Sequence, residues 1–301
     1  MKEMKLLTIF TPTFNRAYIL PKLYESLKHQ TDKRFEWLIV DDGSTDNTEK
    51  LISEWISAEQ SFNIKYCKTA NGGKHRAINL GVTLANGEMF FIVDSDDQLT
   101  ETAVEKIFLW QKTVNDKSNF AGVAGNRGFT QDKLLGTTFE GEWVDASALE
   151  LDKFNISGDK AEVYYTDILK QYPFPEIDGE NFLTESVVWH RIAHAGYVLR
   201  WVNEIIYLCD YIADGLTMQG REIFAKNPKG YALSVRQTNE FRNCTKKEQA
   251  YAAYYYYVDV KKYMSVWQAL KLLEMSPLTA LFIWWQSLKV FLKPILTRKR
   301  T

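Results

Sequence analysis

The sequence is poor in cysteine and histidine, and neither sign of charge is in marked excess. Among 301 residues there are three cysteines and four histidines, and the formal net charge at pH 7 is −1. Cys67, Cys209 and Cys244 stand far apart, which predicts neither a zinc site nor a disulfide framework and is typical of a reducing cytoplasm. The balanced charge gives no general attraction to nucleic acid, so we expect no nucleic-acid partner.

The sequence also lacks an apolar run long enough to cross a bilayer. A spanning helix needs roughly 20 apolar residues, and the most apolar segment, residues 276–301, is interrupted by Gln286 and Lys289. The opening segment MKEMKLLTIFTPTFNR has only a brief apolar run before Pro12 and Arg16, which predicts a strand and no signal peptide. With 46% hydrophobic and 25% charged residues, the composition is that of a globular protein, which we expect in the cytoplasm.

What the sequence does have is a regular alternation of short apolar runs and amphipathic segments. We predict strands at 6–12, 35–42, 62–68, 88–97 and 120–126, and helices at 18–30, 44–58, 73–85 and 100–112. This alternation predicts an α/β fold, a Rossmann-like and mostly parallel central sheet flanked by helices. Glycine and proline accumulate at 215–230, so we divide the chain into an α/β domain over 1–220 and a helical C-terminal extension over 221–301.

Polar side chains gather where the predicted strands end. Thr11 and Asn15 stand with Pro12 at the end of the first strand, Asp41 and Asp42 end the second, and Asp94, Ser95, Asp96 and Asp97 end the fourth. In open α/β sheets, ligands bind beyond the carboxyl ends of the strands. Clustered carboxylates at that edge suit a hard divalent cation such as Mg²⁺. Taken singly, each of these segments is also typical of a solvated turn.

The segment NGGKHRAINLG (71–81) supplies charge of the opposite sign. Gly72 and Gly73 let the backbone approach a ligand closely, and Lys74 and Arg76 bring cations to the start of a helix, where backbone N–H groups favour anions. A solvated helix start is the alternative for this segment alone. Together with the two acidic turns, it predicts a site for a nucleoside diphosphate and a metal ion.

The segments TPTFNR, WLIVDDGSTDNT, NGGKHRAINLG and FFIVDSDD resemble, in order and spacing, the motifs of family 2 glycosyltransferases over about residues 5–215. The resemblance implies a GT-A fold with a nucleotide-binding half over about 1–97 and an acceptor half over about 98–220. It implies inverting transfer from a nucleotide sugar, usually a UDP-sugar, with Mn²⁺ or Mg²⁺. The acceptor expected from the family is a glycan or lipid-linked saccharide of bacterial surface polysaccharide, such as capsule or lipopolysaccharide.

The resemblance also implies roles for single residues. Those implied to lie at the nucleotide are Thr11, Pro12, Asn15, Asp41, Asp42, Gly73, Lys74, Asp94 and Ser95. Of these, Thr11 and Pro12 would line the uracil and ribose pocket, and Asp41 or Asp42 would contact uracil. The DSD segment is similar to the D-x-D motif of the family, in which Asp94 would face the ribose and Asp96 would reach the metal. Asp210 could supply a third metal or diphosphate contact, where the family commonly has histidine.

The catalytic base of the family normally lies in a Glu-Asp pair before a helix. In GENFLTESVVWHR the corresponding residues are Glu185 and Ser186. Because serine cannot act unaided as a base near neutral pH, we predict Glu185 as the base, with Glu180 and Asp178 as reserves. Ser186 leaves open a scaffold that binds nucleotide without transferring sugar. A sugar nucleotidyltransferase is disfavoured because the loop TPTFNRAY, after the first strand, has no glycine.

Residues 277–300 combine leucine and tryptophan with the basic residues Arg298, Lys299 and Arg300. This pattern predicts a helix at the membrane interface, which would place the protein peripherally on the inner face of the plasma membrane. The alternative is a helix that packs on the domain or on a second subunit, which would make the protein a homodimer.

Overall fold

The computed structural model describes residues 6–114, 118–209 and 220–297, with side chains as far as residue 289. The chain divides into two compact units, one made of Met1–Glu176 and Arg191–Ala213, the other of Ile177–His190 and Asp214–Thr301. The first contains the sheet, and the second is helical. Residues 177–190, which the sequence analysis assigned to the acceptor half, belong to the second unit.

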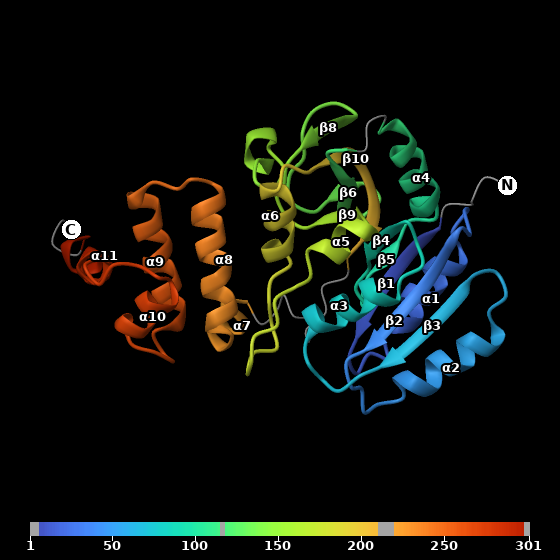
Figure 1. Cartoon of the computed structure of the whole chain (residues 1–301), viewed down its shortest axis with the longest axis horizontal. Coiled ribbons are helices and arrows are strands. Elements are labelled where there is room, and N and C mark those ends of the chain that lie inside the picture. The colour runs from blue at the N-terminus through green and yellow to red at the C-terminus, as the bar shows by residue number, and fades with distance from the viewer. Residues whose placement is uncertain (1–5, 115–117, 210–219, 298–301) are drawn as a thin grey trace. The chain divides into compact units, whose positions relative to one another are not determined.

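A ten-stranded sheet forms the first unit, in the order β3-β2-β1-β4-β9-β6-β10-β5, with β7 and β8 paired to β6 and β10 (Figure 1). The strands are β1 (Leu7–Thr13), β2 (Phe35–Asp41), β3 (Asn63–Lys68), β4 (Met89–Ile92), β5 (Gln98–Leu99), β6 (Phe120–Thr130), β7 (Lys133–Leu134), β8 (Trp143–Ala146), β9 (Lys160–Tyr165) and β10 (Val198–Leu208). β1 to β4 are parallel, as predicted, and β10 is parallel to β6. β9 runs antiparallel between β4 and β6. The carboxyl ends of β1, β2, β4, β6 and β10 therefore lie at one edge of the sheet.

The helices of this unit are α1 (Leu20–Lys28), α2 (Thr48–Ala58), α3 (Lys74–Leu84), α4 (Ala103–Thr113) and α5 (Thr166–Gln171), with a short 3₁₀ turn at Leu151–Phe154. The first four are the helices predicted from the sequence. Their positions follow from apolar strands that are buried on both faces. Gly81 of α3 packs directly on Phe10, and a Cβ at that glycine would come within 2.2 Å of the ring. On α1, Tyr24 stacks with Trp37 and Trp55.

The helix α6 (Ser186–His194) begins in the second unit, and its residues from Arg191 on belong to the first. The other helices of the second unit are α7 (Arg221–Lys226), α8 (Pro228–Phe241), α9 (Lys246–Val260), α10 (Val266–Leu272) and α11 (Thr279–Thr297). Capping boxes at Thr245 and Ser265 fix the starts of α9 and α10, because each side chain accepts a backbone N–H of the first turn. Tyr256, Ala269 and Ile283 contribute to the core of this unit. Among the described helices, none has the length and apolar character needed to span a membrane.

Candidate functional site

The acidic turn Asp94–Asp97 joins β4 to β5, and a tyrosine of β10 holds it in place. The hydroxyl of Tyr207 accepts the backbone N–H of Asp94 at 2.9 Å and donates to Oδ2 of Asp97 at 2.7 Å. The Tyr207 side chain is fully buried, and Tyr207 pairs with Leu99 of β5. The turn is thus anchored at both of its ends to one buried side chain.

Two cations face the first carboxylate of this turn. The Nζ of Lys74 lies 2.6 Å from Oδ1 of Asp94, and Nη1 of Arg127 lies 3.6 Å from Oδ2. Burial would raise the pKa of Asp94, but the charges of Lys74 and Arg127 outweigh it and lower that pKa. Arg127 is itself fixed, because its guanidinium lies 4.1 Å from the ring centre of Tyr207 and its Nε donates to the carbonyl of Lys160.

The other two carboxylates of the turn are crowded by negative charge. Burial and the charge of Asp94 raise the pKa of Asp96, and the same two causes raise the pKa of Asp97 to about 7. A hard divalent cation would relieve this crowding, because oxygen ligands are the ones that such ions prefer. Mg²⁺ in particular is often held by one or two protein carboxylates, with substrate phosphates completing its shell. The donor set of Asp94 and Asp96 therefore fits the predicted metal.

The described residues do not by themselves provide a complete set of ligands for a metal ion. Within residues 6–114, 118–209 and 220–297, no group of three or more His, Cys, Asp or Glu side chains is arranged to hold a metal ion. Asp210, the predicted third contact, lies outside the described residues. A metal bound here would take its remaining ligands from elsewhere, which is the pattern expected when the phosphates of a substrate supply them.

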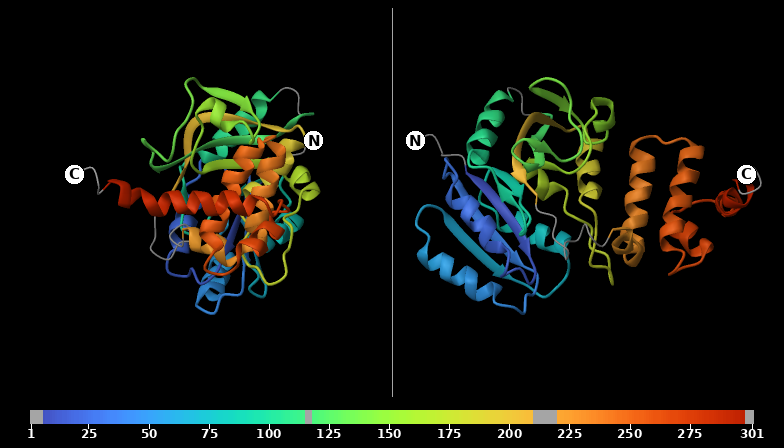
Figure 2. Two further views of the ribbon diagram at one scale, coloured as in Figure 1. Left: turned by 90° about the vertical axis from the view of Figure 1, so that its left-hand side faces the viewer. Right: turned by 180° about the vertical axis from the view of Figure 1, so that it is seen from behind.

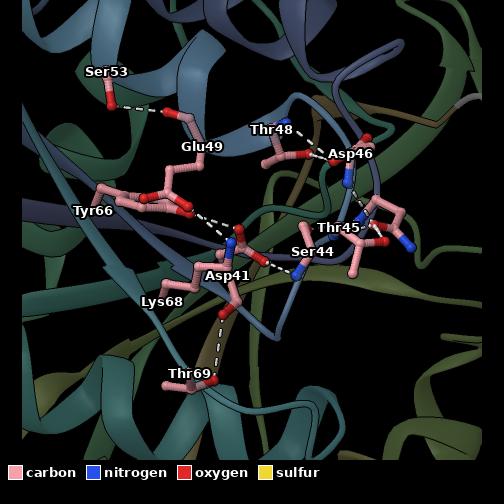
Figure 3. Close-up of polar contacts among 11 residues, drawn as sticks. Asp41, Ser44, Thr45, Asp46, Thr48, Glu49, Ser53, Tyr66, Lys68 and Thr69 are labelled. Atoms are coloured by element: carbon pink, nitrogen blue, oxygen red, sulfur yellow. Dashed lines mark hydrogen bonds and ion pairs between the residues drawn. The ribbon is translucent and has the colours of Figure 1, made fainter.

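Asp41, the first acid of the turn after β2, uses both oxygens of its carboxylate in hydrogen bonds within the protein (Figure 3). Oδ1 of Asp41 accepts the backbone N–H of Ser44 at 2.7 Å, and Oδ2 accepts the hydroxyl of Tyr66 at 2.6 Å. Its carbonyl also accepts the N–H of Thr69 at 2.8 Å. Burial and the hydrogen bond to Asp41 raise the pKa of Tyr66. Because Asp41 is completely buried, its carboxylate has no surface to offer a ligand.

The second acid of that turn fastens the basic loop. Oδ1 and Oδ2 of Asp42 accept the N–H groups of Gly72 and Gly73 at 2.7 and 2.8 Å. Gly43, at φ +87°, lets the two loops approach closely, since a Cβ there would lie 2.8 Å from a backbone nitrogen of the facing loop. Burial raises the pKa of Asp42. Each of its oxygens keeps a second lone pair and 7% of the residue is exposed, so Asp42 can still accept a hydrogen bond, unlike Asp41.

The residues predicted after β1 mainly organise the strand end. Oγ1 of Thr11 is buried and accepts the indole N–H of Trp37 at 2.9 Å. Asn15 adopts φ +54°, and its Oδ1 accepts the N–H of Thr45 at 2.8 Å, which shapes the turn before α2. Pro12 is half-buried at the end of the strand. Among these three residues, Pro12 is the one whose side chain takes part in no such hydrogen bond.

The basic loop presents one lysine toward the acidic turn. Gly73 is the N-cap of α3, with φ +96°, and Lys74 is the first residue of the helix. The Lys74 side chain is 24% exposed where it meets Asp94. Arg76 is turned back instead, because its guanidinium donates to the carbonyl of Gly72 and pairs with Glu176 at 3.3 Å. Lys74 is thus the cation of this loop that reaches the acidic turn.

The predicted base belongs to the second unit. Glu185 is half-buried, and its carbonyl accepts the N–H of Val188 at 2.9 Å in the first turn of α6. The reserve candidate Glu180 has a structural task, since its two oxygens accept the N–H groups of Lys229 and Gly230 at 2.8 Å each and so cap α8. Ser186 lies 3.2 Å from the hydroxyl oxygen of Thr184.

Sequence reasoning missed Arg127 and Tyr207 and left Asp97 out of the predicted site. Arg127 follows directly after the predicted strand 120–126, so its place at the carboxyl edge of the sheet could have been inferred. Tyr207 could not, because residues 127–215 showed no regular period that would predict β10. Asp97 stood in the quoted acidic cluster, but only the hydrogen bond from Tyr207 gives it a distinct role.

Residues 8–150 match the family model described as Glycosyl transferase family 2. Glycosyltransferase GlyG of Streptococcus pneumoniae is 31% identical over 104 residues, which are 35% of this chain and 34% of GlyG. The GalNAc(5)-diNAcBac-PP-undecaprenol beta-1,3-glucosyltransferase of Campylobacter jejuni is 27% identical over 197 residues, which are 62% of this chain and 59% of that enzyme. The chain therefore spans less than two thirds of the length of either relative.

Solved structures match over more of the chain. S. aureus TarS 1–349 in complex with UDP-GlcNAc has a TM-score of 0.62 at 18% identity, covering 85% of this chain and 81% of the other. The mannosyltransferase PcManGT from Pyrobaculum calidifontis, in complex with GDP-Man and Mn²⁺, has a TM-score of 0.58 at 16% identity, covering 98% and 83%. At these identities the match shows the fold, which is the GT-A fold predicted from the sequence.

Proposed function

The chain belongs to glycosyl transferase family 2 through residues 8–150, and we propose that it transfers a sugar from a UDP-sugar to an acceptor hydroxyl with inversion at the anomeric carbon. The observation that carries this proposal is the acidic turn Asp94–Asp97, fixed by Tyr207 and faced by Lys74. A bound pyrophosphate is stabilised by a metal ion and by a cationic side chain close to it. This edge of the sheet offers carboxylates as ligands for the metal ion and supplies Lys74 as the cationic side chain.

On the donor side, Asp42 would accept a hydrogen bond from a base N–H, and Pro12 would pack against the base or ribose. Asp94 and Asp96 would hold the divalent cation, Mn²⁺ or Mg²⁺, and a cation bound there would stabilise the charge that develops on the departing diphosphate. Lys74 would move its ammonium from Asp94 to the diphosphate, next to the N–H groups at the start of α3. Arg127 would stay with Asp94, because Tyr207 and a backbone carbonyl hold it.

On the acceptor side, Glu185 would take the proton of the attacking hydroxyl as the new glycosidic bond forms. The capping role of Glu180 supports this choice, because taking up a proton would weaken the hydrogen bonds by which its oxygens hold the N–H groups of Lys229 and Gly230 at the start of α8. Asp210 remains a proposed third contact. The Campylobacter relative is named for an undecaprenol-linked substrate, which supports a glycan or lipid-linked saccharide of a bacterial surface polysaccharide as the acceptor.

The test is nucleotide release from a panel of UDP-sugars and GDP-sugars, with and without Mn²⁺. We expect release from a UDP-sugar to require Mn²⁺ and to fall by at least about 100-fold in Glu185→Gln, the usual scale for losing a general base. Calorimetry separates binding from chemistry. Glu185→Gln should bind UDP as the wild type does, whereas Asp96→Asn should lose the gain in affinity that Mn²⁺ gives. Asp132→Asn, an exposed acid between β6 and β7, is the matched control.

The outcomes discriminate among the alternatives. UDP binding without turnover of any donor would favour the scaffold that Ser186 left open. Selective turnover of a GDP-sugar would replace the proposed donor but keep the transferase. Equal affinity for UDP with and without Mn²⁺, together with a silent Asp96→Asn, would reject the metal-dependent donor site.

A further inference from the structure

The helix α11 is apolar on two opposite sides. Ala280 and Ile283 face inward and are fully buried in the core of the second unit. On the outside lie Leu278, Leu281, Trp284, Trp285 and Leu288, which together form what we call the α11 face. Leu281 is 60% exposed and Trp285 is 51% exposed. At 3.6 residues per turn, positions 281, 284, 285 and 288 fall within an arc of roughly 100°.

Such a face is unusual for a helix whose inner side is already packed. The outer side of a surface helix is normally polar, and a helix that is apolar all round is found in a protein core or in contact with lipid. The left view of Figure 2 shows α11, in red, as one straight helix that extends past the orange helices of the same unit. Packing onto the core of its own unit therefore accounts for the inner side of α11 but not for the α11 face.

The C-terminal part of the sequence is rich in positive charge. Residues 246–301 contain ten of the 37 Lys and Arg residues of the chain but only three of its 38 Asp and Glu residues. Residues 275–301 contain Lys289, Lys293, Arg298, Lys299 and Arg300, with no acidic residue. The chain as a whole carries a net charge of −1, so this positive charge is a local feature. It complements a negatively charged partner.

The side chains at this face suit the boundary between lipid and water. Trp284 meets Trp267 of α10 edge to face at 5.8 Å, and the Nζ of Lys289 lies 3.2 Å from the ring centre of Trp285. Tryptophan favours the headgroup level of a bilayer, where one part of its ring is apolar and another is wet. Lysine can place its stem on apolar surface while its ammonium stays in water.

We propose that the α11 face binds the surface of an anionic lipid bilayer, with the helix lying in the plane of the interface. Leucine and tryptophan side chains enter the boundary between headgroups and acyl chains, and Lys289 contacts lipid phosphates. The helix does not span the bilayer. The proposal goes beyond the transfer reaction and does not depend on the donor site. A second copy of the chain on the α11 face is the outcome that the test must distinguish.

The experiment is flotation of the full chain with vesicles of phosphatidylcholine alone and with one third phosphatidylglycerol. We expect binding to the anionic vesicles that weakens steeply as salt is raised. The double variant Leu281→Ser, Leu288→Ser should bind roughly tenfold more weakly or worse, because it removes two apolar side chains from the interface. The matched control is Leu109→Ser, since Leu109 is a 51% exposed leucine of α4 in the first unit.

Each result decides between the occupants. Flotation that depends on phosphatidylglycerol and on the two leucines, but not on Leu109, supports the proposal. Failure to float with either vesicle overturns it, as does equal binding to neutral vesicles. A concentration-dependent dimer in analytical ultracentrifugation that the double variant dissolves would assign the α11 face to a second copy. UDP-sugar turnover, measured in solution on the same variants, reports on the donor site separately.

Discussion

The hydroxyl of Tyr207 is the contact whose removal tests the architecture of the site most directly. In Tyr207→Phe the ring stays, so its packing on Phe91 and beneath Arg127 is preserved. The variant loses two hydrogen bonds, one from the N–H of Asp94 at 2.9 Å and one to the carboxylate of Asp97 at 2.7 Å. Both groups belong to the turn that would hold the metal and the diphosphate.

The expected cost follows from the kind of group that loses its partner. A buried backbone N–H left unsatisfied costs about 1–3 kcal/mol, and a hydrogen bond to a charged group contributes about 1.5–3 kcal/mol. Because the site relaxes in part, we expect the free energy of unfolding to fall by about 2–4 kcal/mol in total. The affinity for UDP with Mn²⁺ should fall by about tenfold or more, since a turn that loses its anchor must be ordered again on binding.

Two measurements check this reasoning, urea unfolding for stability and calorimetry for UDP with Mn²⁺. The matched control is Tyr256→Phe, another buried tyrosine, whose hydroxyl donates to the carbonyl of Pro228 at 2.9 Å in the second unit. It should lose about 1 kcal/mol of stability, the cost of one neutral hydrogen bond, and bind nucleotide normally. If Tyr207→Phe resembled this control in both measurements, the idea that Tyr207 holds the acidic turn would be wrong.

Three further variants probe the loops and the pH dependence. Asp42→Asn replaces an oxygen that accepts one of two glycine N–H groups by an NH₂ donor, so urea unfolding should show a loss of about 2–3 kcal/mol and calorimetry a weaker UDP affinity. Gly73→Ala forces alanine to φ +96° and ψ 154°, a region open essentially to glycine alone, at a cost of about 1–3 kcal/mol. The control Gly179→Ala, at φ +79° in open space, should also lower the stability measured by urea unfolding but leave UDP binding unchanged. Equal effects of the two variants on binding would contradict a role for Gly73 at the diphosphate. Burial lowers the pKa of His75 to about 4 from an ordinary value of 6.5, so the neutral ring is favoured in the folded state and up to about 3 kcal/mol of stability should disappear as the pH falls from 6.5 to 4. Urea unfolding at pH 7 and pH 5 should show a flatter pH dependence in His75→Gln but not in the surface variant His29→Gln, and parallel curves for wild type and His75→Gln would refute the assignment.

Much of the first unit could be predicted because its signals are local. Apolar runs such as FFIV predict strands, and amphipathic segments such as residues 73–85 predict helices, without information from the rest of the chain. The four parallel strands and four helices therefore appear where they were expected. β4 ends at Ile92 and not at residue 97, because Asp94–Asp97 form a turn that leads into β5. The irregular region 127–215 gave no such period, and β7 to β10 were not predicted.

The sequence by itself determined that carboxylates would follow β2 and β4 and that a Gly-Gly-Lys loop would stand before α3, because turn chemistry and strand ends are properties of neighbouring residues. Only the tertiary structure decided which of these groups remain available to a ligand. Asp41 is buried on Ser44 and Tyr66, whereas Asp42 keeps some exposed surface. The anchor of the acidic turn comes from a residue 113 positions away. Local sequence patterns do not indicate which strands become neighbours in a sheet. The order of the strands in the folded sheet is what placed Tyr207 beside Asp94.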